Sequence, residues 1–127
     1  MIHATKRRAV LIALTGWTGR LLAVGLFLLW GAFFLEHFQW FIHPERGWPP
    51  ARVWLLQGVH LIMLIGLLAL LRWKLLGSAL TVLGALAFFW FVAGNRFTAF
   101  FAVTILPAVL VLTAHFLQPA SVAKPTQ

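Results

Sequence analysis

The residues of this chain that are capable of chemistry are few, and three of them interrupt long apolar stretches. Glu36 and His37 are adjacent near the end of the first stretch, and His60 lies inside the second. Gln57 precedes His60 by three residues, so the two share one face of a helix. Ionisable groups inside a bilayer are costly and mark functional sites by default. These residues therefore define the candidate site.

These residues have two possible structural or binding functions: they join helices, or they hold a cofactor. An interhelical polar clamp would tie the first two stretches together through hydrogen bonds. Its predicted members are Glu36, His37, Arg52, Gln57 and His60. Alternatively, a neutral imidazole of His37 or His60 would ligate the iron of a haem or the magnesium of a chlorophyll, for which helix bundles are common hosts.

Two further kinds of chemistry use the same residues. Glu36, His37 and His60 would form a divalent metal site, because carboxylate and imidazole ligands suit zinc, copper and iron. They would otherwise relay protons or a substrate, although the later stretches offer few polar residues at matching depth. The chain has no cysteine, which excludes disulfides and iron–sulfur clusters. No set of nucleophile and base appears, so we predict a protein that is not an enzyme.

Membrane-spanning helices must position these residues. The chain is 62% hydrophobic and 9% charged, with a mean hydropathy of +0.95, and a soluble domain of this size leaves too much surface in water to hide that composition. A spanning helix needs about 20 apolar residues. We expect an all-α domain over residues 18–117, an integral membrane four-helix bundle with antiparallel up-down-up-down helices. The predicted spans are residues 18–41, 53–71, 75–94 and 97–117.

The remaining segments are short. Residues 42–52 form the predicted outer loop, residues 1–17 a cytoplasmic or interfacial N-terminal segment, and residues 118–127 a flexible C-terminal tail. Small residues at four-residue spacing let helices approach closely in lipid. We expect such packing at Gly77, Thr81, Gly84 and Ala85, and also at Gly25, Gly31, Gly58 and Gly66.

The basic residues predict the orientation of the bundle. If the helices alternate in direction, seven basic residues lie on the side of the termini and three on the other side. The seven are Lys6, Arg7, Arg8, Arg20, Arg72, Lys74 and Lys124, and the three are Arg46, Arg52 and Arg96. Cytoplasmic segments carry the excess of Lys and Arg, so both termini are expected in the cytoplasm. The net charge of +8 is scattered over the ends of apolar runs, which does not indicate nucleic-acid binding.

Several short motifs support a resemblance. Glu36-His37-Phe38-Gln39-Trp40-Phe41, a loop with prolines, Gln57-Gly58-Val59-His60-Leu61 and Arg72-Trp73 follow in this order. Between about Arg20 and Leu117, the chain resembles a group of small bacterial four-span membrane proteins that have no settled activity. The resemblance implies a multi-pass protein of the bacterial inner membrane and assigns no role to any residue.

These observations predict a non-catalytic function. The loops are too short to build a site in water, and the helix faces suit packing against lipid and against other membrane subunits. We expect an accessory or scaffolding subunit of a larger bacterial membrane complex, respiratory or photosynthetic. The first alternative is a haem-, chlorophyll- or metal-binding protein that uses His37 and His60. The second is a free-standing small transporter or membrane-stress protein.

Overall fold

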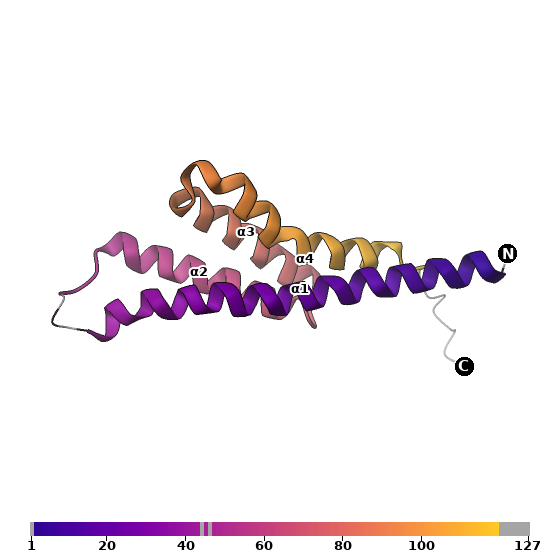
Figure 1. Ribbon diagram of the computed structural model, residues 1–127, viewed down its shortest axis with the longest axis horizontal. Coiled ribbons are helices and arrows are strands. Elements are labelled where there is room, and N and C mark those ends of the chain that lie inside the picture. The colour runs from indigo at the N-terminus through magenta and orange to yellow at the C-terminus, as the bar shows by residue number, and fades with distance from the viewer. Residues whose placement is uncertain (1, 44, 46, 120–127) are drawn as a thin grey trace, which may run out of the picture.

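Four long helices make up almost all of the computed structural model, which describes residues 2–43, 45 and 47–119 (Figure 1). They are α1 (Ile2–Ile42), α2 (Ala51–Ala69), α3 (Lys74–Val92) and α4 (Phe97–Leu117), and the short 3-10 turn η2 (Gly94–Arg96) precedes α4. Each helix is long and apolar enough to cross a membrane. The predicted all-α fold with four apolar helices is therefore confirmed, and it is that of a multi-pass membrane protein in contact with lipid. Most of the predicted tail, residues 120–127, lies outside the described part.

α1 is one continuous helix, so it joins the predicted N-terminal segment and the predicted first span. Its 41 residues extend about 60 Å at 1.5 Å per residue, whereas a bilayer with its headgroups measures about 40–45 Å. Ile12 is the first buried residue of α1. The turns before Ile12, which carry Lys6, Arg7 and Arg8, extend beyond the other helices in Figure 1.

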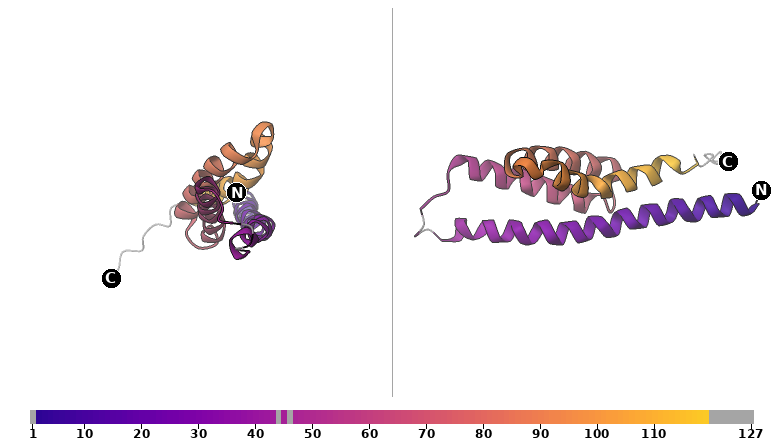
Figure 2. Two further views of the ribbon diagram at one scale, coloured as in Figure 1. Left: turned by 90° about the vertical axis from the view of Figure 1, so that its left-hand side faces the viewer. Right: turned by 45° about the horizontal axis from the view of Figure 1, so that its top comes forward.

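The helices do not pack equally. α2 packs most extensively against α3, and α1 packs most extensively against α4, while α3 and α4 join the two pairs. α1 and α2 share the smallest of these four interfaces, although only the outer loop separates them in sequence. Figure 2 shows α1 lying along one side of the other helices. The core between the helices includes Trp30, Met63, Leu67, Phe89 and Val111.

Small residues allow the close approach of α2 and α3. The four residues predicted for packing on α3 are all buried: Gly77, Thr81, Gly84 and Ala85. A Cβ atom added at Gly84 would lie 2.8 Å from the backbone nitrogen of Met63 in α2. Cβ atoms at Gly66 and Gly77 would meet the backbone of the facing helix even more closely. The side chain of alanine therefore does not fit at these three positions.

A second close approach joins α1 to α4 and was missed from the sequence. A Cβ atom at Gly19 would lie 2.8 Å from Cγ2 of Val111 and 3.0 Å from the carbonyl oxygen of Pro107. By contrast, a Cβ atom at Gly25, Gly31 or Gly58 would meet nothing within 4 Å. These three glycines were predicted to pack between helices, but none of them makes a close approach to another described residue.

The two ends of the molecule differ in their polar residues. The loop end contains His37, Gln57 and Arg96, and the basic end contains Arg20 and Lys74. At the loop end, Gly94 has a φ of +56°, a left-handed conformation that glycine adopts without strain, and it turns the chain from α3 into α4. Pro107 lies inside α4 and has no backbone N–H to donate to the preceding turn.

Candidate functional site

His60 is the most enclosed polar residue of the predicted site. Its exposed fraction is 2%, and its ring lies 4.4 Å from the ring of Phe88 in α3 and 5.5 Å from the ring of Phe34 in α1, measured between centroids. Its Nε2 atom is buried and makes no hydrogen bond with any described residue. A neutral imidazole has one donor and one acceptor nitrogen, so a buried nitrogen without a partner is a feature that needs an explanation.

Gln57 forms a hydrogen bond between α2 and α1. Its Nε2 donates a hydrogen bond of 3.1 Å to the carbonyl oxygen of Phe34. Both residues lie in the half of their helices next to the outer loop, so this bond holds the two helices together where their interface is smallest. The acceptor is the backbone, which the side-chain pattern could not indicate.

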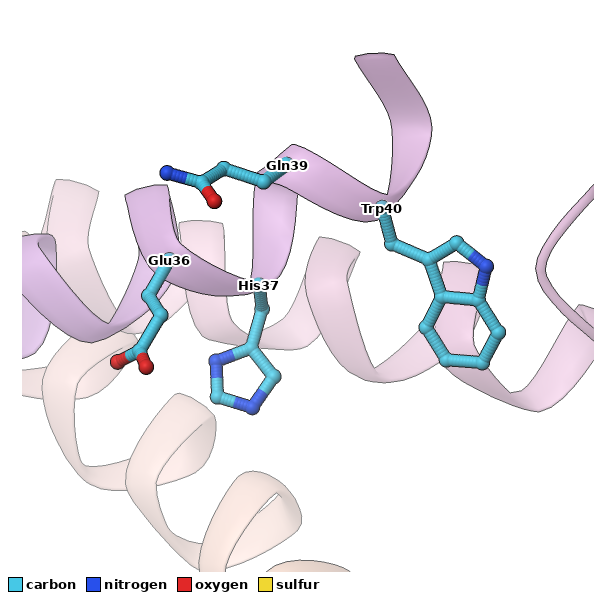
Figure 3. Close-up of a pocket in the computed structure, with 4 residues that line it drawn as sticks. All are labelled: Glu36, His37, Gln39 and Trp40. Carbon is cyan, nitrogen blue, oxygen red and sulfur yellow. The ribbon is translucent and has the colours of Figure 1, made fainter. Parts of the chain in front are cut away.

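Glu36 and His37 do not take part in such a tie. Figure 3 shows both side chains on one side of α1, with Gln39 on the other side. Both residues are exposed, and they line an open surface hollow with Gln39 and Trp40. The Nδ1 atom of His37 lies 2.7 Å from the carbonyl oxygen of Phe33 in the same helix, and because a carbonyl only accepts, Nδ1 is the donor.

Of the five residues predicted for the clamp, Gln57 forms a hydrogen bond to the facing helix in the described part of the chain. Glu36 and Arg52 are exposed, and within the described ranges neither forms an ion pair. The one ion pair found there joins His43 to Glu45 at 2.9 Å. The reason is the rotation of each helix about its axis: Gln57 faces α1, whereas Glu36 lies on an exposed face of α1.

The predicted divalent metal site at Glu36, His37 and His60 is not formed. No group of three His, Asp or Glu side chains among the described residues is arranged to hold a metal ion. Glu36 is exposed on α1, while His60 is buried behind the rings of Phe34 and Phe88. The two side chains thus lie in different surroundings.

The structure instead forms a cavity that the sequence did not indicate. Its volume is about 310 Å³, and all four helices and η2 contribute to its lining. Five lining residues are aromatic, namely Trp30, Phe33, Phe88, Phe89 and Phe100, and three are polar, namely His37, His60 and Arg96. A smaller cavity of about 170 Å³ is also lined by His37, His60 and Phe88, and it extends to Gln57 and Trp40. Phe88 thus lines both spaces beside His60.

One wall of the larger cavity is held by a buried hydrogen bond. The Nε1 atom of Trp30 donates to Oγ1 of Thr104 in α4 over 3.1 Å. The indole also packs against Phe89 and Phe100 with centroid distances of 5.1 and 5.9 Å. Indole N–H groups usually find a partner when they are buried, and here that partner fixes α1 against α4.

Arg96 and Phe88 are two of the cavity residues that sequence reasoning missed. From the sequence, Arg96 was interpreted as part of the turn after the third span and as a basic residue on the loop side, and it was not assigned to the site. Phe88 is one of many phenylalanines, and no pattern distinguishes it from residues that contact lipid.

The chain matches no known protein family, no curated protein and no solved structure.

Proposed function

We propose that this chain is a membrane protein that binds a lipophilic ring molecule between its helices, with His60 as the central polar contact. The supporting observation is the aromatic cavity beside a buried imidazole nitrogen that makes no hydrogen bond with the described residues. Ligand sites are mostly apolar cavities with a few convergent polar groups. The three polar residues of this cavity, His37, His60 and Arg96, match that composition.

The size of the cavity favours a small ring system. Ligand sites occupy about 300–1,000 Å³, and about 310 Å³ lies at the lower limit of this range. A substituted system of one or two fused rings with a carbonyl oxygen, such as a benzoquinone or naphthoquinone head group, fits this volume better than the macrocycle of a haem or chlorophyll. His60 would donate a hydrogen bond to the carbonyl oxygen. Because Nε2 is enclosed, the ligand would displace the side chain of Phe88 to reach it.

The proposed orientation is an antiparallel up-down-up-down bundle in the bacterial inner membrane with both termini in the cytoplasm. The contacts of α1 with α4 support the direction, because Gly16 lies near Ala114 whereas Gly19 lies near Val111. The excess of basic residues on the side of the termini supports the sidedness. In this orientation, the aromatic cavity lies on the side of the outer leaflet.

Binding of a short-chain naphthoquinone to the purified chain tests the proposed function. Trp30 lines the cavity, so we expect saturable quenching of tryptophan fluorescence. His60→Ala should weaken binding about tenfold, because a hydrogen bond of about 1–1.5 kcal/mol is lost. His115→Ala is the matched control, since His115 lies in the last turn of α4, away from the cavity. Quenching that stays linear with concentration and equal in all three proteins would reflect partition into detergent and contradict the proposal.

A haem titration separates the two kinds of ring ligand. A Soret band that forms on addition of haem and disappears in His60→Ala would favour the macrocycle. A colourless protein that still binds naphthoquinone would favour the small ring. The Phe88→Ala variant should bind either ligand more tightly, since it removes the ring that covers the imidazole.

A second candidate function is that of a non-catalytic accessory or scaffolding subunit of a respiratory or photosynthetic complex. Gly25, Gly31 and Gly58 have no neighbour within 4 Å of an added Cβ atom. An apolar groove of about 530 Å³ between α1 and α2 contains Gly31 and Ala32, and helices of other subunits pack at such small residues. In a native gel of solubilised membranes, the wild-type chain should then migrate with a larger complex. A Gly31→Leu variant should migrate separately from that complex.

A further inference from the structure

A second enclosed space lies at the basic end, away from His60 and the aromatic cavity. It is a niche of about 70 Å³, and it lies where α1, the start of α3 and the end of α4 meet. Its polar lining consists of Arg20, Lys74 and Gln118, and Trp17 and Gly16 are beside them. In liquid water one molecule occupies about 30 Å³, so the niche holds about two waters or one group of similar size, such as a phosphate.

Arg20 is held in place but is not neutralised. Its guanidinium carbon lies 5.4 Å from the ring centroid of Trp17, which is a cation–π contact. Its Nε atom is buried and forms no hydrogen bond within the described part of the chain. A buried N–H of a charged group without an acceptor is costly. The described residues therefore supply no acceptor for this N–H group, and a group bound in the niche would supply one.

The other groups of the niche are also positive. Lys74 is half-buried and is the first residue of α3. The N-terminus of this helix has no side-chain cap, and helix N-termini carry a partial positive charge. Two cationic side chains and a helix terminus thus meet at one place, and all of them favour an anion.

No acidic side chain is available to balance these charges. The chain contains only two acidic residues, Glu36 and Glu45. Glu45 pairs with His43 in the outer loop, and Glu36 lies near the loop end of α1. The nearer of the two in sequence, Glu36, is 16 positions after Arg20 on one helix, which is about 24 Å. Neither acidic side chain therefore supplies the counter-charge of the niche.

We infer that the niche binds the phosphate group of an anionic phospholipid in the adjoining leaflet. Ile12, Ala13 and Trp17 give the niche an apolar border, and Trp17 is 61% exposed, as is typical of tryptophan at a membrane interface. Basic pockets between spanning helices bind lipid headgroups in this way. A free phosphate ion would use the same cations but would gain nothing from the apolar border.

Native mass spectrometry of the full chain with bound lipid tests this inference. The chain is released from micelles that contain equal amounts of phosphatidylglycerol and phosphatidylcholine, and the lipid adducts are counted. We expect phosphatidylglycerol to be retained preferentially. Each of the variants Arg20→Ala and Lys74→Ala should reduce its retention about fivefold, because each removes one basic contact with the headgroup bound in the niche.

The matched control removes the same number of positive charges outside the niche. The double variant Arg52→Ala/Arg72→Ala loses two exposed arginines that do not line it, and its retention of phosphatidylglycerol should equal that of the wild type.

Three outcomes would overturn the inference. The first is equal retention of both lipids by the wild type, and this comparison requires no variant to fold. The second is displacement of the lipid by inorganic phosphate at equal concentration, because this result would assign the niche to a free ion. The third is unchanged lipid retention by the double variant Arg20→Ala/Lys74→Ala when its circular dichroism spectrum is also unchanged.

Discussion

Trp30 and Thr104 form the buried hydrogen bond between side chains of two helices in the described part of this protein. Trp30→Phe removes the donor and keeps an aromatic ring beside Phe89 and Phe100, and Thr104→Val removes the acceptor at nearly constant volume. Interhelical hydrogen bonds in membranes average about 0.6 kcal/mol and reach about 1.7 kcal/mol. We expect a coupling energy in this range from a double-mutant cycle of unfolding in mixed detergent micelles. A coupling energy of zero would mean that this bond does not stabilise the bundle.

Single residues also explain which part of the site could be predicted. The depth of Glu36, His37 and His60 follows from their positions in the apolar stretches, because the rise per residue is constant. Their direction does not, since each residue turns about 100° from the last and the rotation of a whole helix is set by its neighbours. His60 therefore faces rings in the interior, while Glu36 faces outward.

At the scale of helices, the α2–α3 interface provides a sharp test of close packing. Gly84→Ala would place a methyl group 2.8 Å from the backbone nitrogen of Met63, and a backbone cannot move aside as a flexible side chain does. We expect unfolding to become easier by about 1–3 kcal/mol, the usual cost of overpacking. The measurement is denaturation in mixed micelles followed by circular dichroism.

Gly58→Ala is the matched control in the facing helix. An added Cβ atom meets nothing within 4 Å there, and alanine favours a helix by up to about 1 kcal/mol over glycine. The control should be as stable as the wild type or slightly more stable. If both variants were equally stable, α2 and α3 would not be in close contact in the membrane.

The elements themselves were easier to predict than their limits and partners. Long apolar runs predict helices in lipid because no other donor or acceptor is present for the backbone, and the four helices follow from this. The continuity of α1 across residue 18, the predicted start of the first span, did not follow. The apolar pattern marks the span but does not show whether the segment before it belongs to the same helix, and α1 runs unbroken from Ile2 to Ile42.

For the whole molecule, proximity in sequence was a poor guide to the cavity. The candidate site was expected between the first two spans, which are joined by the outer loop. α1 and α2 have the smallest of the four main interfaces, and the cavity beside His60 needs Phe88 from α3 and Phe100 from α4. Three-dimensional neighbours of this kind depend on the packing of all four helices, which small residues such as Gly19 and Gly84 determine.

The proposed arrangement in the membrane can be tested on the whole chain by single cysteine substitutions. The protein has no cysteine of its own, so each introduced thiol is the only one that a maleimide can label. Ala4 and Gln118 are exposed near the two ends of the described chain. Trp48, which is 81% exposed, and Asn95 lie in the two turns at the loop end.

In intact cells, a maleimide that does not cross membranes should label Trp48→Cys and Asn95→Cys. It should label Ala4→Cys and Gln118→Cys only after the membrane is permeabilised, because the excess of basic residues keeps that side in the cytoplasm. Labelling of the opposite pair in intact cells would invert the orientation and move the niche at Arg20 to the outer leaflet. Labelling of one residue from each pair would contradict the up-down-up-down arrangement itself, because an even number of spans must separate residues on the same side.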